Sequence, residues 1–333
     1  MPLNLNTAVM VLKNETTAGT AVSFDSTDYD LLVKDVEVSP VMNFDDANKY
    51  LTGDHGRDLQ IKGVESAEVS GTIDLRWGGA VDTAPAFAKL LKSLGCVENT
   101  YSTTGIGYSD QKCADSTTST IRIYMPKIGC NNNALTVTIA GAIGNSATLQ
   151  VENVAGAWRL AFKFIGRIES VDDTNYSDIP VLDDSNLDSA TPERFTNNSV
   201  SLLGTTTSIS NFSLDFGLEA SPVYDQSVGD LSHYVITGKN PILSCNPYAG
   251  LVSENDIWND ASSMTEGVTN INTGQTPPHL TLEMPRGQYL PQGFGDVEGL
   301  VTWELNIAAL RNGSINADIP DESSFELLIG ARS

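Results

Sequence analysis

The residues that could do chemistry are few, and they are poorly grouped. The 333-residue chain contains three histidines and four cysteines. His55 lies in the polar segment Gly53-Asp54-His55-Gly56, where no partner stands at a spacing suited to metal binding or proton transfer. We find no Ser/His/Asp or Cys/His arrangement in the sequence. We therefore expect no enzyme activity, no catalytic residue and no bound metal or cofactor.

The cysteines allow two interpretations. They form no C-x-x-C pair, and their spacing matches no common metal site. They are either free, partly buried thiols of a protein made in a reducing cytoplasm, or one pair within residues 96–130 forms a disulfide after release into an oxidising medium. The residues concerned are Cys96, Cys113, Cys130 and Cys245.

Acidic and glycine-rich motifs predict loops and turns rather than ligand sites. Asp45-Asp46 and Asp172-Asp173 could bind Ca²⁺ only loosely, because neither belongs to a D-x-[DN]-x-[DN]-G loop. Gly141-Ala-Ile-Gly144 lacks the Lys-Ser/Thr of a phosphate-binding loop. We expect this glycine motif to form a tight β turn.

The net charge excludes several classes of partner. Forty-two acidic side chains against 19 basic ones give a formal charge of −23. This is the wrong sign for a protein that grips nucleic-acid phosphates or docks on an anionic membrane. No apolar run approaches the roughly 18 residues of a membrane span, and the first residues do not have the pattern of a secretory signal.

The pattern around these residues is that of an all-β chain. Apolar and polar residues alternate over residues 67–77, so Val69 and Ile73 share one face of a strand while Glu68 and Asp74 share the other. Breaks rich in Gly, Asn and Asp separate such segments. Further strands are expected at 30–38, 120–125, 134–139, 147–154, 157–171, 199–203, 208–219, 231–237, 241–244, 279–284, 299–310 and 324–329.

One short helix is predicted after residue 83. Four apolar residues recur at helical spacing and form one stripe, suited to lying across a sheet. Asp82 or Thr83 could cap its start, and Gly95 fits the left-handed position after its end. The apolar residues are Phe87, Leu90, Leu91 and Leu94. A weaker helix is possible within residues 246–264.

The chain divides into two β-rich parts. Residues 1–171 form the first domain, which opens with an irregular arm (1–28) and contains a polar loop at 96–119. Residues 172–198, rich in acids, are expected to be a linker. Residues 199–333 form the second domain. A long polar excursion separates two good strands of the first domain, which is typical of a functional loop or an extended hairpin. Its marker residues are Asn43, Asp45, Asp46, Gly53, His55 and Gly63.

The two parts resemble each other weakly, as a diverged internal repeat would. Met125-Pro126-Lys127 aligns with Met284-Pro285-Arg286, and Trp158-Arg-Leu160 with Trp303-Glu-Leu305. The alternative is that any two β-rich stretches align this well. If the repeat holds, Trp158 and Trp303 occupy equivalent core positions.

The segment from Thr83 to Val171 resembles the major tail tube protein of long, non-contractile-tailed phages. The features that resemble this family are a helix leading to Gly95-Cys96, a Tyr101-Ser-Thr103 loop, a Ser119-Thr-Ile121 strand, the Gly141-Ala-Ile-Gly-Asn145 turn, Ala155-Gly156, and an aromatic strand ending at Phe164-x-Gly166. Ile143 stands where the family often has Arg. The segment Ile209–Gly217 also resembles the strand that opens the second part of such proteins.

The resemblance implies a fold and an assembly. The fold would be an antiparallel β-sandwich or half-barrel with one flanking helix, and six such domains would close into a ring with a continuous inner barrel. A duplicated chain would form a trimeric ring with pseudo-sixfold symmetry, and an unduplicated one a hexameric ring. Ring closure removes exposed sheet edges. Stacked rings would form a virion tail tube, assembled in the host cytoplasm.

The resemblance also implies partners. Tail terminator and tail-tip proteins would bind the ends of the tube, while the tape measure protein and genomic DNA would pass through without specific binding. An acidic wall would keep DNA centred by repelling its phosphates. Glu68, Asp74 and Glu304 are the candidate lumen-facing acids, and the excursion from Asn43 to Gly63 is the candidate contact between rings.

Two other functions remain open at this stage. A surface β-sandwich module, such as an adhesin or a carbohydrate-binding domain, would present aromatic residues in loops, and only Trp258 lies in an irregular region. A hydrolase with paired carboxylates is the other possibility, although no pair of acids stands out.

Overall fold

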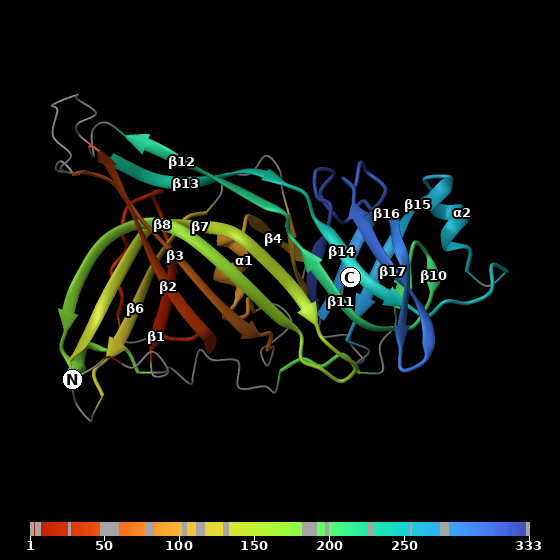
Figure 1. Cartoon of the computed structure of the whole chain (residues 1–333), viewed down its shortest axis with the longest axis horizontal. Helices are drawn as coiled ribbons and strands as arrows, with labels where there is room; N and C mark the ends of the chain where they lie inside the picture. Colours follow the sequence, from red (N-terminus) through yellow and green to blue (C-terminus); the bar gives the residue numbers. More distant parts are fainter. Residues whose placement is uncertain are drawn as a thin grey trace, which may run out of the picture.

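The computed structural model shows an elongated molecule with two β lobes side by side (Figure 1). The prediction of an antiparallel all-β fold is confirmed, since most strands join one 16-stranded sheet. The structure describes residues 3, 8–25, 28–46, 60–76, 83–101, 105–110, 117–128, 133–181, 192–196, 200–225, 230–253, 255–273 and 280–330.

The first lobe holds six strands in the order β1-β6-β7-β8-β3-β2. Helix α1 (Ala88–Ser93) follows β3 in the chain. A hairpin of β4 (Cys96–Tyr101) and β5 (Gly105–Asp110) pairs with the late strand β18 (Glu326–Gly330). The six strands are β1 (Val9–Asn14), β2 (Val33–Asp46), β3 (Gln60–Asp74), β6 (Ser119–Pro126), β7 (Ala134–Val151) and β8 (Arg159–Thr174).

The second lobe holds the order β9-β15-β16-β17-β14-β11, with β10 (Thr205–Thr206) outside β9. Helix α2 (Ile257–Ser262) follows β14, as α1 follows β3. The six strands are β9 (Val200–Leu202), β11 (Ile209–Asp215), β14 (Ile242–Pro247), β15 (Glu266–Asn272), β16 (Leu280–Val297) and β17 (Leu300–Ala309).

The strand order is therefore the same in the two lobes. Taken along the chain, β1, β2, β3, β6, β7 and β8 correspond to β9, β11, β14, β15, β16 and β17. Each lobe also has a long hairpin: β2–β3 in the first, and β11–β14 in the second. The second hairpin continues into β12 (Leu218–Asp225) and β13 (Asp230–Lys239), which pair with each other.

The strand order corrects part of the sequence alignment. Met125 lies in β6, whereas Met284 lies in β16, which corresponds to β7, so the Met-Pro motifs are not equivalent. Trp158 and Trp303 do belong to corresponding places, just before β8 and within β17. Trp158 is completely buried, whereas Trp303 is only half-buried, so their environments differ.

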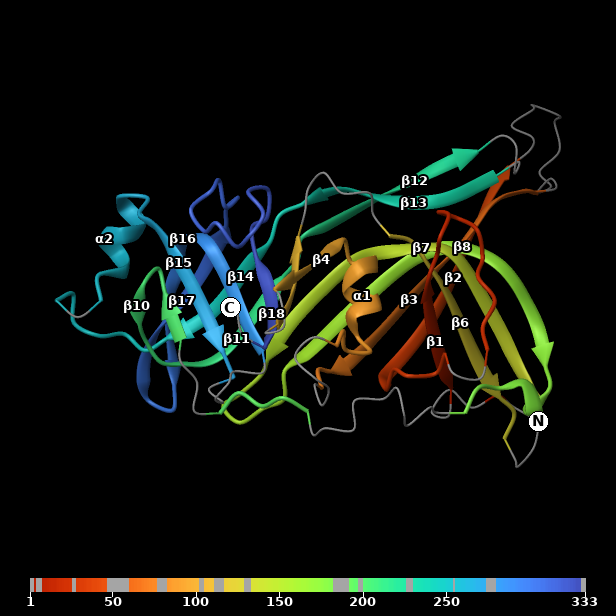
Figure 2. The ribbon, with the colours of Figure 1, turned by 180° about the vertical axis from the view of Figure 1, so that it is seen from behind.

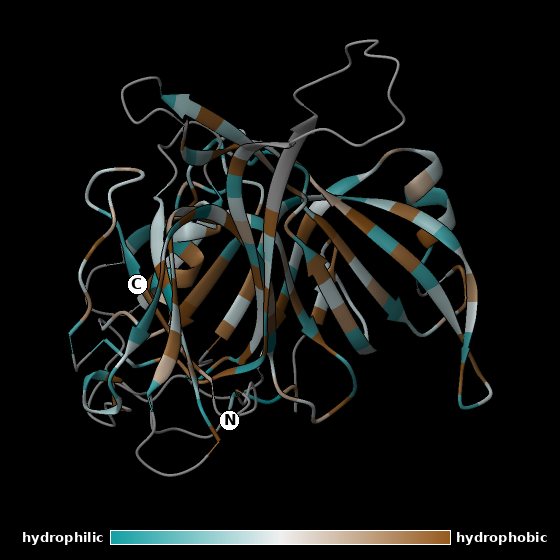
Figure 3. Ribbon diagram, turned by 60° about the vertical axis from the view of Figure 1, so that its left-hand side comes forward, coloured by the Kyte–Doolittle hydropathy of each residue, from teal (hydrophilic) through white to brown (hydrophobic). Residues whose placement is uncertain are grey.

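Strand β7 joins the two lobes. Its first part pairs with β6, and its last residues, Thr148–Val151, pair with Phe212–Asp215 of β11. The core is continuous across this contact, where Phe212 meets the ring of Trp158 edge-on at 4.9 Å between centroids. Brown and teal residues alternate along the strands in Figure 3, as expected for strands with one face on a core.

Helix α1 packs against β1, β4, β5 and β7 and lies in front of the curved strands in Figure 2. The predicted apolar stripe is buried, and Gly95 follows the helix with a positive φ of 78°. The predicted cap is wrong: Phe87 occupies the N-cap, and its side chain makes no capping hydrogen bond.

Several expected loops are strands instead. The entry arm contains β1, whose Met10 and Leu12 are buried, and the polar loop at 96–119 contains β4 and β5. The expected turn at Gly141–Gly144 is an irregular stretch within continuous β7, with shifts in its pairing to β8. The ends of the expected linker belong to the first lobe, because β8 runs to Thr174 and Phe195 is buried in the core.

Candidate functional surface

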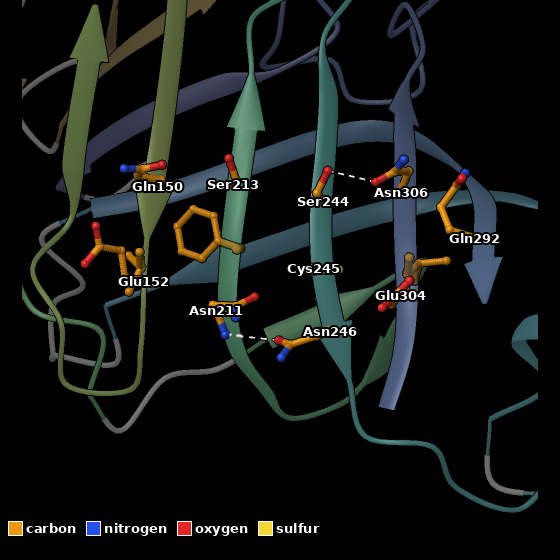
Figure 4. A pocket seen from close by; sticks show the side chains of 13 residues that line it. Gln150, Glu152, Asn211, Ser213, Ser244, Cys245, Asn246, Gln292, Glu304 and Asn306 are labelled. Carbon is orange, nitrogen blue, oxygen red and sulfur yellow. Dashed lines mark hydrogen bonds between the residues drawn. The ribbon is translucent and has the colours of Figure 1, made fainter. Parts of the chain in front are cut away.

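One face of the sheet is polar across both lobes. Alternation places one side chain in two away from the core on β3, β8, β7, β11, β14 and β17. Over the junction of the lobes this face forms an open hollow of about 510 Å³ (Figure 4). Its polar lining is made of Gln150, Glu152, Asn211, Ser213, Ser244, Asn246, Gln292, Glu304 and Asn306.

The three acids predicted to face a channel occupy this polar face. Glu68 and Asp74 lie on β3 at positions that alternate with buried Val69 and Ile73, and Glu304 lies on β17 between half-buried Trp303 and buried Leu305. The alternation of polar and apolar residues in the sequence thus predicted that these three acids lie on the polar face of the sheet. Whether that face lines a channel stays a prediction.

Ion pairs neutralise two of the three acids. Lys163 Nζ lies 2.6 Å from Glu68 Oε2, and Lys34 Nζ lies 2.5 Å from Asp74 Oδ2. Arg159 Nε lies 3.3 Å from the other oxygen of Asp74. These cations come from the neighbouring strands β8 and β2. The face is therefore closer to charge balance around β3 than the net charge of the chain suggested.

Glu304 has a different environment from the other two acids. Its side chain is exposed in the hollow of Figure 4, among amides and hydroxyls. Ser244 Oγ donates a hydrogen bond to Asn306 Oδ1 at 2.7 Å, and Asn246 Nδ2 donates one to Ser210 Oγ at 2.6 Å. Such neutral groups can bind polar ligands through water, and they carry no positive charge that would attract phosphates.

The hairpin β12–β13 covers part of the same polar face. It lies over β3, β7 and β8 (Figure 1), where Leu231 and Tyr234 pack with Ile143, Ile165 and Val64. The apolar residues that interrupt the polar pattern of this face are thus explained by the hairpin. A segment of the second lobe is in this way fastened onto the first.

Gly141 of β7 must be a glycine because of this hairpin. Its φ of +59° is unfavourable for other residues, and an added Cβ would lie 2.7 Å from the Cβ of His233 on β13. The glycine that suggested a turn in the sequence therefore allows a close approach of the hairpin.

The candidate inter-ring residues fall partly outside the described residues. Asn43, Asp45 and Asp46 lie at the end of β2, Gly63 lies in β3, and the backbones of these strands pair as far as Asp46 and Gln60. Gly53 and His55 lie outside the described residues. The described ends of the excursion thus form an extended hairpin, and its role between rings stays a prediction.

Buried carboxylates serve the fold. Glu15 accepts hydrogen bonds from the hydroxyls of Thr118 and Thr120 and from the backbone N–H of Gly141. Asp110 accepts bonds from the backbone N–H groups of Ser324 and Phe325. Burial raises the pKa of Asp110 above its usual range. Sequence reasoning missed both acids, because their partners come from distant strands.

No group that could hold a metal occurs within the described part of the chain, where no three His, Cys, Asp or Glu side chains gather. Cys96 and Cys245 are buried free thiols, and burial raises the pKa of each to about 12. Cys113 and Cys130 lie outside the described residues.

No protein-family model matches the chain, and no curated protein matches it in sequence. Among the described residues, neither helix is long and apolar enough to cross a membrane.

Proposed function

We propose that this chain is a ring-forming structural subunit of a phage tail tube, of the long, non-contractile type. The observation that carries the proposal is the run of eight strands, β2-β3-β8-β7-β11-β14-β17-β16, in which two lobes of the same strand order are joined edge to edge. A sheet that is extended by repeating such lobes can close into a barrel.

The matching order of the lobes supports a duplicated chain. In this proposal three copies supply six lobes, and the ring has pseudo-sixfold symmetry. Because ring closure pairs every free edge, it also protects a long β chain from aggregation. Rings then stack into a tube in the virion, between tail-tip and terminator proteins.

The polar face is the proposed inner wall. Amides, hydroxyls and paired charges cover it, and Glu304 adds an exposed negative charge. The described residues of this wall offer DNA phosphates no cluster of free cations, so DNA and the tape measure protein pass without lasting contacts. The proposed wall is therefore a low-friction surface rather than a strongly acidic one.

Negative-stain microscopy of the purified protein, combined with native mass spectrometry, tests the proposal. We expect rings or tubes with a central hole and a mass three times the 35.6 kDa of one chain. A mass of six chains would retain the tube but refute the duplication. A protein that stays monomeric at high concentration would refute the proposal itself.

A carbohydrate-binding module is the second candidate, and one observation favours it. Trp258 of α2 is exposed beside a hollow lined by Tyr289, Leu290 and Pro291, and exposed aromatic rings can stack on sugars. Quenching of tryptophan fluorescence by oligosaccharides, lost in Trp258→Ala, would support this alternative over the structural role.

A further inference from the structure

The contact between β7 and β11 shows how one lobe attaches to the next. Thr148–Val151 at the end of β7 pair antiparallel with Phe212–Asp215 of β11. On the core side, Phe212 and Leu214 pack with Leu149 and cover Trp158, all of which are buried. We call this contact the internal joint.

Each lobe has both kinds of strand that such a joint needs, one in the position of β7 and one in the position of β11. Within one chain, the first lobe contributes only its β7 to a joint, and the second lobe contributes only its β11. In the second lobe, β16 corresponds to β7, and its outer edge pairs with β15 only as far as Gln288. In the first lobe, β2 corresponds to β11, and it pairs only with β3. Within the described residues, the edge of β16 beyond Gln288 and the outer edge of β2 have no partner strand.

The free edge of β16 exposes apolar side chains. Phe294 of β16 is 66% exposed although its ring lies 4.2 Å from that of Trp303, and Leu300 and Val301 at the same hairpin end are each more than half exposed. At the internal joint the corresponding tryptophan, Trp158, is completely buried. The difference follows from β11, which covers Trp158 and has no counterpart over Trp303 in the part of the chain that the structure describes.

We propose that the free edge of β16 binds the first part of β2, Val33–Val38, of a second copy of this chain. The two strands would pair antiparallel, as β7 and β11 do within one chain. Half-buried Val36 and Val38, which already touch the core of their own lobe, would extend it onto Phe294 and Val301 of the neighbour. Pro40 lies within β2, two residues after Val38, and would end the pairing there, since it has no N–H to donate.

This contact is head-to-tail, because it joins two different edges. A head-to-tail contact leaves one β2 edge and one β16 edge free until a ring closes. The inference rests on the proposed function in one respect, because only closure into a ring would pair every β2 edge with a β16 edge. The contact between β16 and β2 is then the contact that holds the proposed ring together.

The first test breaks the β16 edge. In Phe294→Asp/Val301→Asp, two charges replace exposed apolar side chains, so the subunit should stay folded but lose assembly. Val154→Asp, which changes an equally exposed valine in the turn between β7 and β8, is the matched control. Native mass should show monomers for the double variant and wild-type assemblies for the control. Circular dichroism checks that both are folded.

The second test restores the contact by mixing. A β2 variant, Val36→Lys/Val38→Lys, keeps an intact β16 edge, and the Phe294→Asp/Val301→Asp variant keeps an intact β2 edge. Each should be monomeric alone, while an equal mixture should form a one-to-one dimer and nothing larger. A contact between two like edges would instead let one variant dimerise alone and would give no dimer that contains one copy of each variant.

The failures of the two proposals are distinguishable. Wild-type rings that form equally well with Phe294→Asp/Val301→Asp would overturn this inference and leave the proposed tube intact. A wild-type chain that never assembles would overturn both. If the β2 variant fails to fold, the β16 variant and its control alone decide the matter.

Discussion

At the scale of single residues, Trp158 and Trp303 differ in burial, because among the described residues a neighbouring strand covers only the first of them. Trp158 is completely buried against Phe212, whereas Trp303 is half-buried beside exposed Phe294. Trp158→Ala in the monomer should therefore lower the free energy of unfolding by about 3–5 kcal/mol, as a buried aromatic does. Trp303→Ala should cost clearly less. Urea unfolding measures both, and equal costs would contradict the difference in burial.

A second residue-scale prediction concerns Asp110. Because burial raises its pKa in the folded protein, its contribution to stability is full below the ordinary value of about 3.9 and is lost as pH rises through the raised pKa. Asp110→Asn should remove this pH dependence. The amide keeps one oxygen for the N–H groups of Ser324 and Phe325, which both donate to Oδ1.

Unfolding free energies measured from acidic to neutral pH check this prediction. The difference between wild type and Asp110→Asn should change across the interval between the two pKa values. Parallel curves would show that Asp110 does not titrate in that interval.

At the scale of elements, a deletion within the β2–β3 hairpin tests its predicted role between rings. Removing residues 45–60 leaves β3 paired with β8 through Ser66–Asp74 and leaves Val33–Val38 untouched. The subunit should fold, and the proposed rings should form but not stack into tubes. Electron microscopy distinguishes rings from tubes, and tubes of normal length would contradict the inter-ring role of the hairpin.

The sequence was informative where structure is local. Alternation assigned Glu68 and Asp74 to the polar face, and helical spacing predicted the stripe of α1. Strands whose partners lie far along the chain were missed, because no local pattern marks them: β5 is stabilised by β18, and polar β15 by β9 and β16. The ion pairs of the acids were missed for the same reason, since Lys163 and Lys34 reach β3 from neighbouring strands.

At the scale of the whole molecule, charge on the polar face should govern contact with DNA. Of the three candidate acids, Glu304 is exposed, and no cation is found beside it among the described residues. Glu304→Lys in assembled rings should therefore increase retention of duplex DNA, and the gain should fall steeply with added salt.

Asp318→Lys is the control, because it makes the same change of net charge at an exposed loop residue. DNA retention is measured on assembled particles over a range of ionic strengths. Equal retention by both variants would show that net charge, rather than the polar face, governs the contact.

The pairing of β18 with β5 has a consequence for the time course of synthesis. Glu326 pairs with Ser109, and Ile329 with Ile106, so the first lobe lacks a strand until nearly the whole chain has left the ribosome. Contacts this distant in sequence form slowly, since a long loop must close first. Nascent or truncated chains would meanwhile leave the edge of β5 open to strands from other molecules. Fast translation or a chaperone would therefore protect this chain until its last strand arrives.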